Sequence, residues 1–257
     1  MKLKIFVCLV YLAFPLNLHA QESESSVIHG DIDPSKPTNL YTQLNTVFEY
    51  QSSNTQDLFG LRSIIQYAFD PDNLLLVEVP FLYNQRTSSF GVSDMRIRYF
   101  NAAKRNVTEK IIAIVPFADV SIPVGSFENG LGSSVWSVAG GVVLGILASE
   151  RLSLFPGISY VHLTKPTTDL IPEDLKFNSN GLGLQFNASY VFNKSTFLFI
   201  NPIPTFLNTD GNWRTVWAGE FNLNKIIIPN KFKMNVGWFP NFTNEVNIIR
   251  LGTTVFL

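Results

Sequence analysis

Residues Gly181 to Phe192 read Gly-Leu-Gly-Leu-Gln-Phe-Asn-Ala-Ser-Tyr-Val-Phe and carry the pattern that decides the fold. Every even-numbered residue from Leu182 to Phe192 is apolar or aromatic, whereas the odd-numbered residues from Gly181 to Ser189 are glycine or polar. A period of two is typical of a strand with one apolar and one polar face. Similar segments of about ten residues recur along the chain, so we expect an all-β protein built from long antiparallel strands.

The N-terminus has the composition of an export signal. Lys2 and Lys4 precede an apolar run from Ile5 to Leu16, and Leu18-His19-Ala20 is a plausible cleavage site. We therefore expect residues 1–20 to be a cleaved signal peptide and residues 21–39, which are polar, to be a periplasmic N-terminal extension. The apolar run is too short for a transmembrane helix. Cys8, the one cysteine, lies within this run, so no disulfide framework is expected.

Residues 40–257 are expected to form one domain, a transmembrane antiparallel β-barrel of about 12 strands, with ten or fourteen also compatible with the pattern. The predicted strands are Leu40–Gln51, Leu58–Phe69, Leu74–Tyr83, Gly91–Phe100, Lys110–Ile122, Val135–Ala148, Arg151–Leu163, Gly181–Phe192, Thr196–Leu207, Trp213–Asn224, Phe232–Phe239 and Glu245–Leu257.

The connections between these strands tend to alternate between short and long. If both termini face the periplasm, the turns at residues 70–73, 149–150 and 193–195 are periplasmic and the long segments 123–134 and 164–180 are extracellular. Two connections, 101–109 and 225–231, are longer than this rule prefers. The alternation indicates a barrel in the outer membrane of a Gram-negative bacterium, with outer-membrane lipid and the barrel assembly machinery as partners.

Aromatic residues cluster near the predicted strand ends, as in the two interfacial girdles of a membrane barrel. The alternative is the aromatic core of a soluble periplasmic β protein. The residues are Tyr50, Tyr67, Phe69, Tyr83, Tyr99, Phe100, Trp136, Tyr160, Tyr190, Phe192, Trp213 and Trp217.

The stretch from Phe90 to Leu163 resembles the MetA-pathway family of phenol degradation, a family of outer-membrane proteins. The resemblance rests on Phe90-Gly91-Val92-Ser93-Asp94, on Ser121-Ile122-Pro123-Val124-Gly125 and on the loop Gly130-Leu131-Gly132-Ser133-Ser134. It implies a β-barrel and a role in the transport of small, often aromatic or hydrophobic, compounds. The family carries no established catalytic residues.

Charged residues at inward-facing positions are the candidate functional residues. Hairpin registers summing near 140 and 174 would set Arg62 beside Glu78, and Glu78 beside Arg96. Charges are costly in lipid, so this cluster is expected to face the lumen, as a constriction that filters solutes or as a structural ion-pair network. The candidates are Arg62, Glu78, Asp94, Arg96, Arg98 and Asp119, with weaker support for Glu49, Arg214 and Glu220.

The alternative of an enzyme rests on His162, which is predicted to lie on the lipid face. Barrel lipid hydrolases place a His and a Ser there, but this chain has His162-Leu163-Thr164 and no acid at a suitable spacing. We expect an interfacial histidine and no catalytic residues.

The remaining classes are disfavoured by composition and motifs. Removing Lys2 and Lys4 from the 19 basic residues leaves 17 against 20 acidic residues, a net charge of −3, which gives no basic nucleic-acid surface. No phosphate-binding loop, paired-histidine metal motif or dinucleotide fingerprint occurs, so we expect no cofactor. The sequence predicts an outer-membrane barrel that binds or passes small solutes, with an outer-membrane lipid hydrolase or a soluble periplasmic β protein as alternatives and the oligomeric state open.

Overall fold

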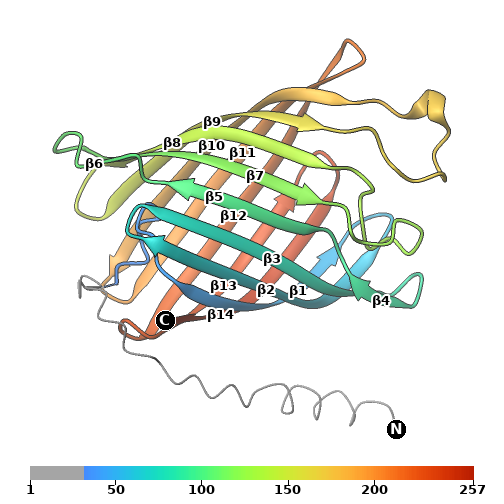
Figure 1. Ribbon diagram of the computed structural model, residues 1–257. Helices are drawn as coiled ribbons and strands as arrows, with labels where there is room; N and C mark the ends of the chain where they lie inside the picture. Colours follow the sequence, from blue (N-terminus) through green and yellow to red (C-terminus); the bar gives the residue numbers. More distant parts are fainter. Residues whose placement is uncertain (1–31) are drawn as a thin grey trace, which may run out of the picture. The chain divides into compact units, whose positions relative to one another are not determined.

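The computed structural model describes residues 32–257 (Figure 1). The predicted signal peptide, residues 1–20, lies outside the described residues, as does the extension before Ile32. The strands are β1 (Gln43–Ser52), β2 (Asp57–Asp70), β3 (Asn73–Asn84), β4 (Ser89–Val92), β5 (Met95–Asn101), β6 (Lys104–Arg105), β7 (Ile111–Ile122), β8 (Ser137–Leu147), β9 (Leu152–Leu163), β10 (Ser179–Asn193), β11 (Thr196–Thr209), β12 (Asn212–Ile228), β13 (Phe232–Asn241) and β14 (Val246–Phe256). A single turn of 3₁₀ helix, Glu173–Leu175, lies between β9 and β10.

All the strands belong to one antiparallel sheet that closes on itself. Apart from β4, β5 and β6, each strand pairs with its neighbours along the chain, and β1 pairs with β14 through ten residue pairs from Gln43↔Phe256 to Ser52↔Asn247. β4 and β5 both pair with β3 and form one interrupted strand, whereas β6 is a short extension paired with β7. The result is a twelve-stranded barrel, so the predicted fold class and strand number are confirmed.

The connections fall into two sets at opposite ends of the barrel. The end that carries the C-terminus has short turns, and the other end has the long connections 123–136 and 164–178 (Figure 1). The two exceptions expected from the sequence have structural reasons. β12 continues to Ile228 and shortens its turn to residues 229–231, and Lys104 and Arg105 pair with Ile114 and Ala113 to extend the β5–β7 hairpin.

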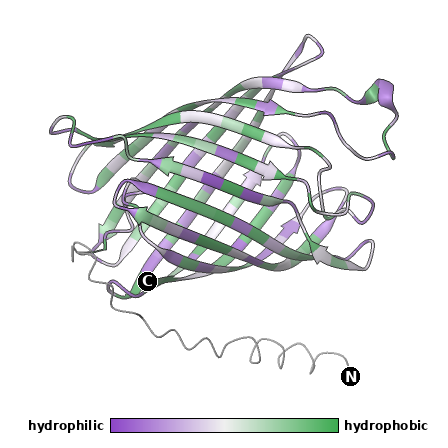
Figure 2. Cartoon of the chain, in the orientation of Figure 1, coloured by the Kyte–Doolittle hydropathy of each residue, from purple (hydrophilic) through white to green (hydrophobic). Residues whose placement is uncertain are grey.

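Apolar and polar residues alternate along the strands, as the colour bands of Figure 2 show, and many of the apolar side chains are exposed. Ile65 and Leu251 are 53% and 57% exposed, and Phe186 on β10 is 51% exposed. Their sequence neighbours point inward and are polar or small, such as Gln66, Gly252 and Asn187. A closed sheet with an apolar exterior and a polar interior satisfies every requirement for a strand structure in hydrocarbon.

Exposed aromatic side chains lie near both ends of the strands. Tyr67, Phe69, Tyr99, Tyr190 and Phe192 lie toward the end with the short turns. Tyr50, Trp136, Tyr160, Trp213 and Trp217 lie toward the opposite end. Phe100 differs from the prediction, because it points inward and packs against buried Val115 and its neighbours.

Prolines interrupt the hydrogen-bond ladders, as Pro156 and the pair Pro202 and Pro204 illustrate. The regular β10–β11 pairing stops at Gly183↔Thr205 and resumes at Ala188↔Ile200. Within that gap the amide of Phe186 donates to Asn201 Oδ1 at 3.2 Å. Proline has no N–H to donate, so a side-chain oxygen replaces part of the missing ladder.

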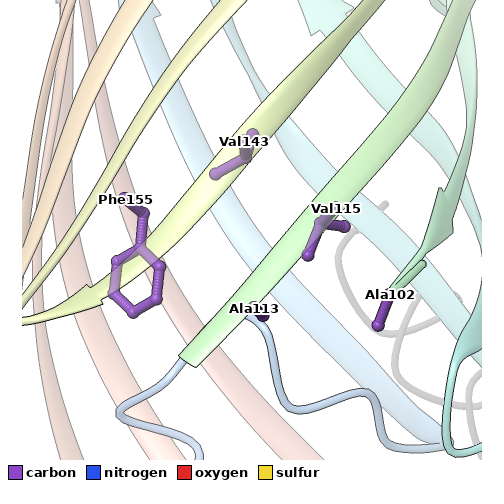
Figure 3. Close-up of a cluster of buried hydrophobic side chains, with 5 residues drawn as sticks. All are labelled: Ala102, Ala113, Val115, Val143 and Phe155. Atoms are coloured by element: carbon purple, nitrogen blue, oxygen red, sulfur yellow. The ribbon is translucent and has the colours of Figure 1, made fainter. Parts of the chain in front are cut away.

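Residues 32–42 run across the interior at the end with the short turns. Ser35 and Thr38 are buried, and Leu40 packs on a cluster formed by Ala102, Ala113, Val115, Val143 and Phe155 (Figure 3). Arg105 Nη1 donates to the carbonyl of Thr38 at 3.0 Å, and its Nε lies 2.6 Å from Asp72 Oδ1. This segment therefore narrows the lumen near the turns.

No helix among residues 32–257 is long and apolar enough to cross a membrane.

Candidate functional site in the barrel lumen

A cavity of about 700 Å³ occupies the lumen. Its floor is the segment from Pro34 to Tyr41, and its walls are inward-facing residues of the strands. One part of the wall is aromatic and apolar, with Phe100, Phe117, Phe155 and Phe199. The charged residues at the cavity are Lys36, Arg96, Arg98, Asp119, Glu220 and Lys233. A concave site with an apolar wall and a few polar groups is typical of small-molecule binding.

The first charged group, which we call the seam cluster, consists of Glu49, Arg62, Glu78 and Arg250. Glu49 is only 1% exposed. It accepts hydrogen bonds from Arg62 Nε and Nη2, both at 2.8 Å, and from Arg250 Nε at 2.9 Å. Arg62 Nη1 also reaches Glu78 Oε2 at 3.0 Å. The four side chains join β14, β1, β2 and β3 across the pairing that closes the barrel.

The seam cluster does not line the cavity, and its charged side chains form salt bridges with one another within the wall. Arg250 additionally lies over the ring of Phe239, with 4.3 Å between the guanidinium carbon and the ring centroid. Buried charges need partners of opposite sign, and here each carboxylate has at least one guanidinium.

The register of β2 and β3 differs by two residues from the prediction. Arg62 lies opposite Pro80, so Glu78 lies opposite Ile64 and diagonal to Arg62. The long arginine side chain bridges this diagonal. In the next hairpin Glu78 does lie opposite Arg96, as predicted. Arg96 nevertheless forms its salt bridge with Asp119 on β7.

The second group, which we call the cavity cluster, consists of Arg96, Arg98 and Asp119. Arg96 Nε donates to Asp119 Oδ1 at 2.8 Å, and Arg96 Nη2 contacts Oδ2. Arg98 Nε lies 3.0 Å from Asp119 Oδ2. The side chain of Arg96 is 40% exposed, and all three residues line the cavity. Two guanidinium groups share this one carboxylate, and Glu220 is the second carboxylate at the cavity.

Glu220 faces the cavity cluster from β12. It is half-buried, hydrogen-bonds Asn201, and has Arg96 and Arg250 as the nearby cations that act on its charge. Arg214, the other residue with weaker support, is exposed and borders a small depression near the long connections.

Asp94 lies apart from both clusters, at the interruption between β4 and β5. Its Oδ1 accepts the amide of Gly125 at 3.2 Å, and its Oδ2 accepts the amide of Ser133 at 2.7 Å. The same loop buries Leu131 against Leu58 and Leu82. Asp94 thus binds the backbone of the connection 123–136, and no solute contact is assigned to it.

The candidate histidine lies on the outer wall near the long connections. His162 Nδ1 is 2.7 Å from Asn180 Oδ1, which also accepts the hydroxyl of Tyr160 at 2.6 Å. The hydroxyl oxygen of Thr164 accepts the amide of Trp136 at 3.1 Å. Thr164 is therefore engaged by backbone and does not form a nucleophile–base pair with His162 in these contacts.

Two parts of the site escaped sequence reasoning. The sequence does not single out Lys233, because a single lysine in a short strand carries no motif, although its alternation with Phe232 and Met234 places it on the inner face. The floor segment from Pro34 to Tyr41 has no periodicity that would reveal burial. No group of three or more His, Cys, Asp or Glu side chains suited to a metal ion occurs in residues 32–257.

Several solved outer-membrane barrels share this fold. An outer-membrane channel from Pseudomonas putida F1 matches with 14% identity and a TM-score of 0.58, over 88% of this chain and 100% of that chain. The NanC porin matches with 13% identity and a TM-score of 0.60, over 83% of this chain and 100% of that one. The KdgM porin in complex with disordered oligogalacturonate matches with 14% identity and a TM-score of 0.54, over 83% and 98%.

No family model matches the chain. A search of curated proteins also finds no match. At such low identity the likeness to the solved structures concerns the fold, and this fold is that of an outer-membrane β-barrel.

Proposed function

We propose that this chain is an outer-membrane channel that binds and passes small solutes through the lumen. The observation that carries the proposal is the cavity of about 700 Å³ inside a closed barrel whose exterior is apolar. That volume falls in the range of small-molecule sites. Outer-membrane lipid would surround the apolar exterior of the barrel. The barrel assembly machinery is the partner that would insert the protein into the membrane.

We propose that the cavity cluster acts on solutes and that the seam cluster holds the barrel closed. Arg96 and Arg98 border the cavity, whereas Glu49 and Arg62 form a salt bridge with each other within the wall. A ring of fixed charge at a narrow point selects permeating ions by sign. The residues that line the cavity include four cations, Lys36, Arg96, Arg98 and Lys233, and two carboxylates, Asp119 and Glu220, and this net positive charge favours anions.

Membership of the MetA-pathway family of phenol degradation remains part of the proposal. It is supported by the stretch from Phe90 to Leu163, whose Asp94 binds the backbone of the glycine-rich loop. The aromatic wall of the cavity suits the aromatic or hydrophobic solutes that this family implies.

We propose further that the barrel catalyses no reaction. His162 hydrogen-bonds an asparagine and has no carboxylate partner among the contacts of residues 32–257. Turnover of lipid A or phospholipid by the purified protein, lost in His162→Ala, would overturn this part.

The test is single-channel recording in a planar bilayer with the purified full-length protein. We expect discrete conductance steps with a preference for chloride over potassium. Arg96→Gln should shift the reversal potential toward cations, whereas Arg151→Gln, in an exposed turn, should not. Absence of any conductance, together with no swelling of liposomes by small solutes, would contradict the proposed function.

A further inference from the structure

Lys233 is a cation at the cavity without a compensating carboxylate. It projects inward from β13, lines the cavity, and its Nζ lies 5.7 Å from the centroid of the Phe197 ring. In the described part of the chain Lys233 has no salt-bridge partner, and no acidic group acts on its charge. The other cations at the cavity differ, since Lys36 pairs with Asp33, and Arg96 and Arg98 pair with Asp119.

The neighbours of Lys233 on the barrel wall are neutral. β12 presents Asn222 and Asn224, and β13 presents Asn235 opposite Asn224. Asn224 is almost completely buried, and its Nδ2 donates to the carbonyl of Asn222 at 2.9 Å. The aromatic face of Phe197 solvates the ammonium group in part, but it supplies no opposite charge. The arrangement therefore leaves the positive charge available to a molecule in the cavity.

The wall next to Lys233 is aromatic. Phe197 and Phe199 meet edge to face, with centroids 5.2 Å apart and an interplanar angle of 73°. Phe197 is buried beneath Lys233, whereas Phe199 is partly exposed and lines the cavity together with Phe155. A flat apolar body can lie against such rings, which pair well in offset or edge-to-face geometry.

We propose that Lys233 and Phe199 form a subsite for a small aromatic carboxylate. The carboxylate binds the ammonium group of Lys233, and the ring of the ligand packs on Phe199. The charge-assisted hydrogen bond gives the carboxylate a preference over a neutral molecule of equal shape. The inference deepens the proposed function, on which it rests for the access of solutes to the lumen.

The experiment compares benzoate with benzamide, which has the same shape and no charge. Binding to the full-length protein in lipid nanodiscs is measured by isothermal titration calorimetry at constant salt. We expect benzoate to bind at least ten times more tightly than benzamide. Lys233→Gln should abolish this preference and leave benzamide binding unchanged, and Lys233→Arg should retain it.

Lys225→Gln is the matched control, because Lys225 is an exposed lysine on the neighbouring strand and contacts Ser195 outside the cavity. Equal affinity of benzoate and benzamide for the wild-type protein overturns the inference, as does a preference that survives Lys233→Gln. If Lys233→Gln fails to fold, equal affinity of the two ligands for the wild-type protein still overturns the inference. Conductance without a benzoate preference would refute the subsite and leave the channel standing, whereas a preference without conductance would refute the channel.

Discussion

At the scale of single residues, the interior charges have two different uses. Glu49 accepts three hydrogen bonds from two arginines while nearly excluded from solvent, which is the environment of a structural ion pair. Arg96 shares Asp119 with Arg98 and remains exposed to the cavity, which is the environment of a group that meets solutes.

Replacement of Glu49 should be strongly destabilising. Glu49→Gln leaves Arg62 and Arg250 without their buried carboxylate, and breaking such a pair typically reduces the free energy of unfolding by about 3 kcal/mol or more. Urea-induced unfolding in detergent micelles, followed by tryptophan fluorescence, measures this loss. Glu150→Gln, in an exposed turn, is the control. Equal stability of the two variants would mean that the seam cluster contributes nothing to barrel closure.

The sequence predicted which of these residues face inward, because a strand alternates strictly. It did not predict their partners. Arg62 reaches Glu78 across a diagonal because the β2–β3 register is set by the turn at residues 71–72 and by the irregularity between Ala68 and Asp70. Such a shift is invisible to the hydrophobic pattern, since moving by two residues leaves every side chain on the same face.

At the scale of elements, side-chain contacts hold one segment outside the strands at each opening of the barrel. The connection 123–136 is fixed by Asp94 and by the insertion of Leu131 between Leu58 and Leu82. Gly125 and Gly132 allow the two arms of this loop to approach so closely that a Cβ on either would meet backbone atoms at 2.4 Å. The sequence marks the loop as rich in glycine but does not reveal this contact.

Removal of the Asp94 carboxylate should release the loop. Asp94→Ala deletes two hydrogen bonds to a charged acceptor, each worth roughly 1.5–3 kcal/mol, so local opening should increase by about tenfold or more. Digestion with a glutamate-specific protease, followed by mass spectrometry, measures the rate of cleavage after Glu128. Asp169→Ala, in the exposed connection 164–178, should leave this rate unchanged. Cleavage at the wild-type rate in Asp94→Ala would contradict the role of Asp94.

The floor segment should limit conductance at the opposite opening. Arg105 holds it through the carbonyl of Thr38 and through Asp72, so Arg105→Gln should loosen it and raise the mean single-channel conductance. Arg151→Gln, at the same end of the barrel and exposed, should not change it. A conductance in Arg105→Gln equal to that of the wild-type protein would show that the segment does not restrict the path.

At the scale of the whole molecule, alternation over twelve strands defines the architecture. Each predicted strand has a counterpart in the barrel, because the alternation of apolar and polar residues extends over eight or more positions and survives the interruptions at proline. The floor segment could not be predicted in the same way. Its burial depends on the shape of a lumen that exists only after all strands have closed.

In a membrane barrel, lipid hydrocarbon is the solvent of the outer face and water is the solvent of the inner face. Phe186 and Asn187 are neighbours on β10, with Phe186 exposed outside and Asn187 at the cavity. Spin labels on Phe186→Cys and Asn187→Cys, in a protein without Cys8 and embedded in bilayers, report their surroundings by electron paramagnetic resonance. We predict that the label at 186 is relaxed by oxygen, which concentrates in lipid, and the label at 187 by a water-soluble nickel chelate. Equal exposure of both labels to the chelate would contradict the membrane barrel.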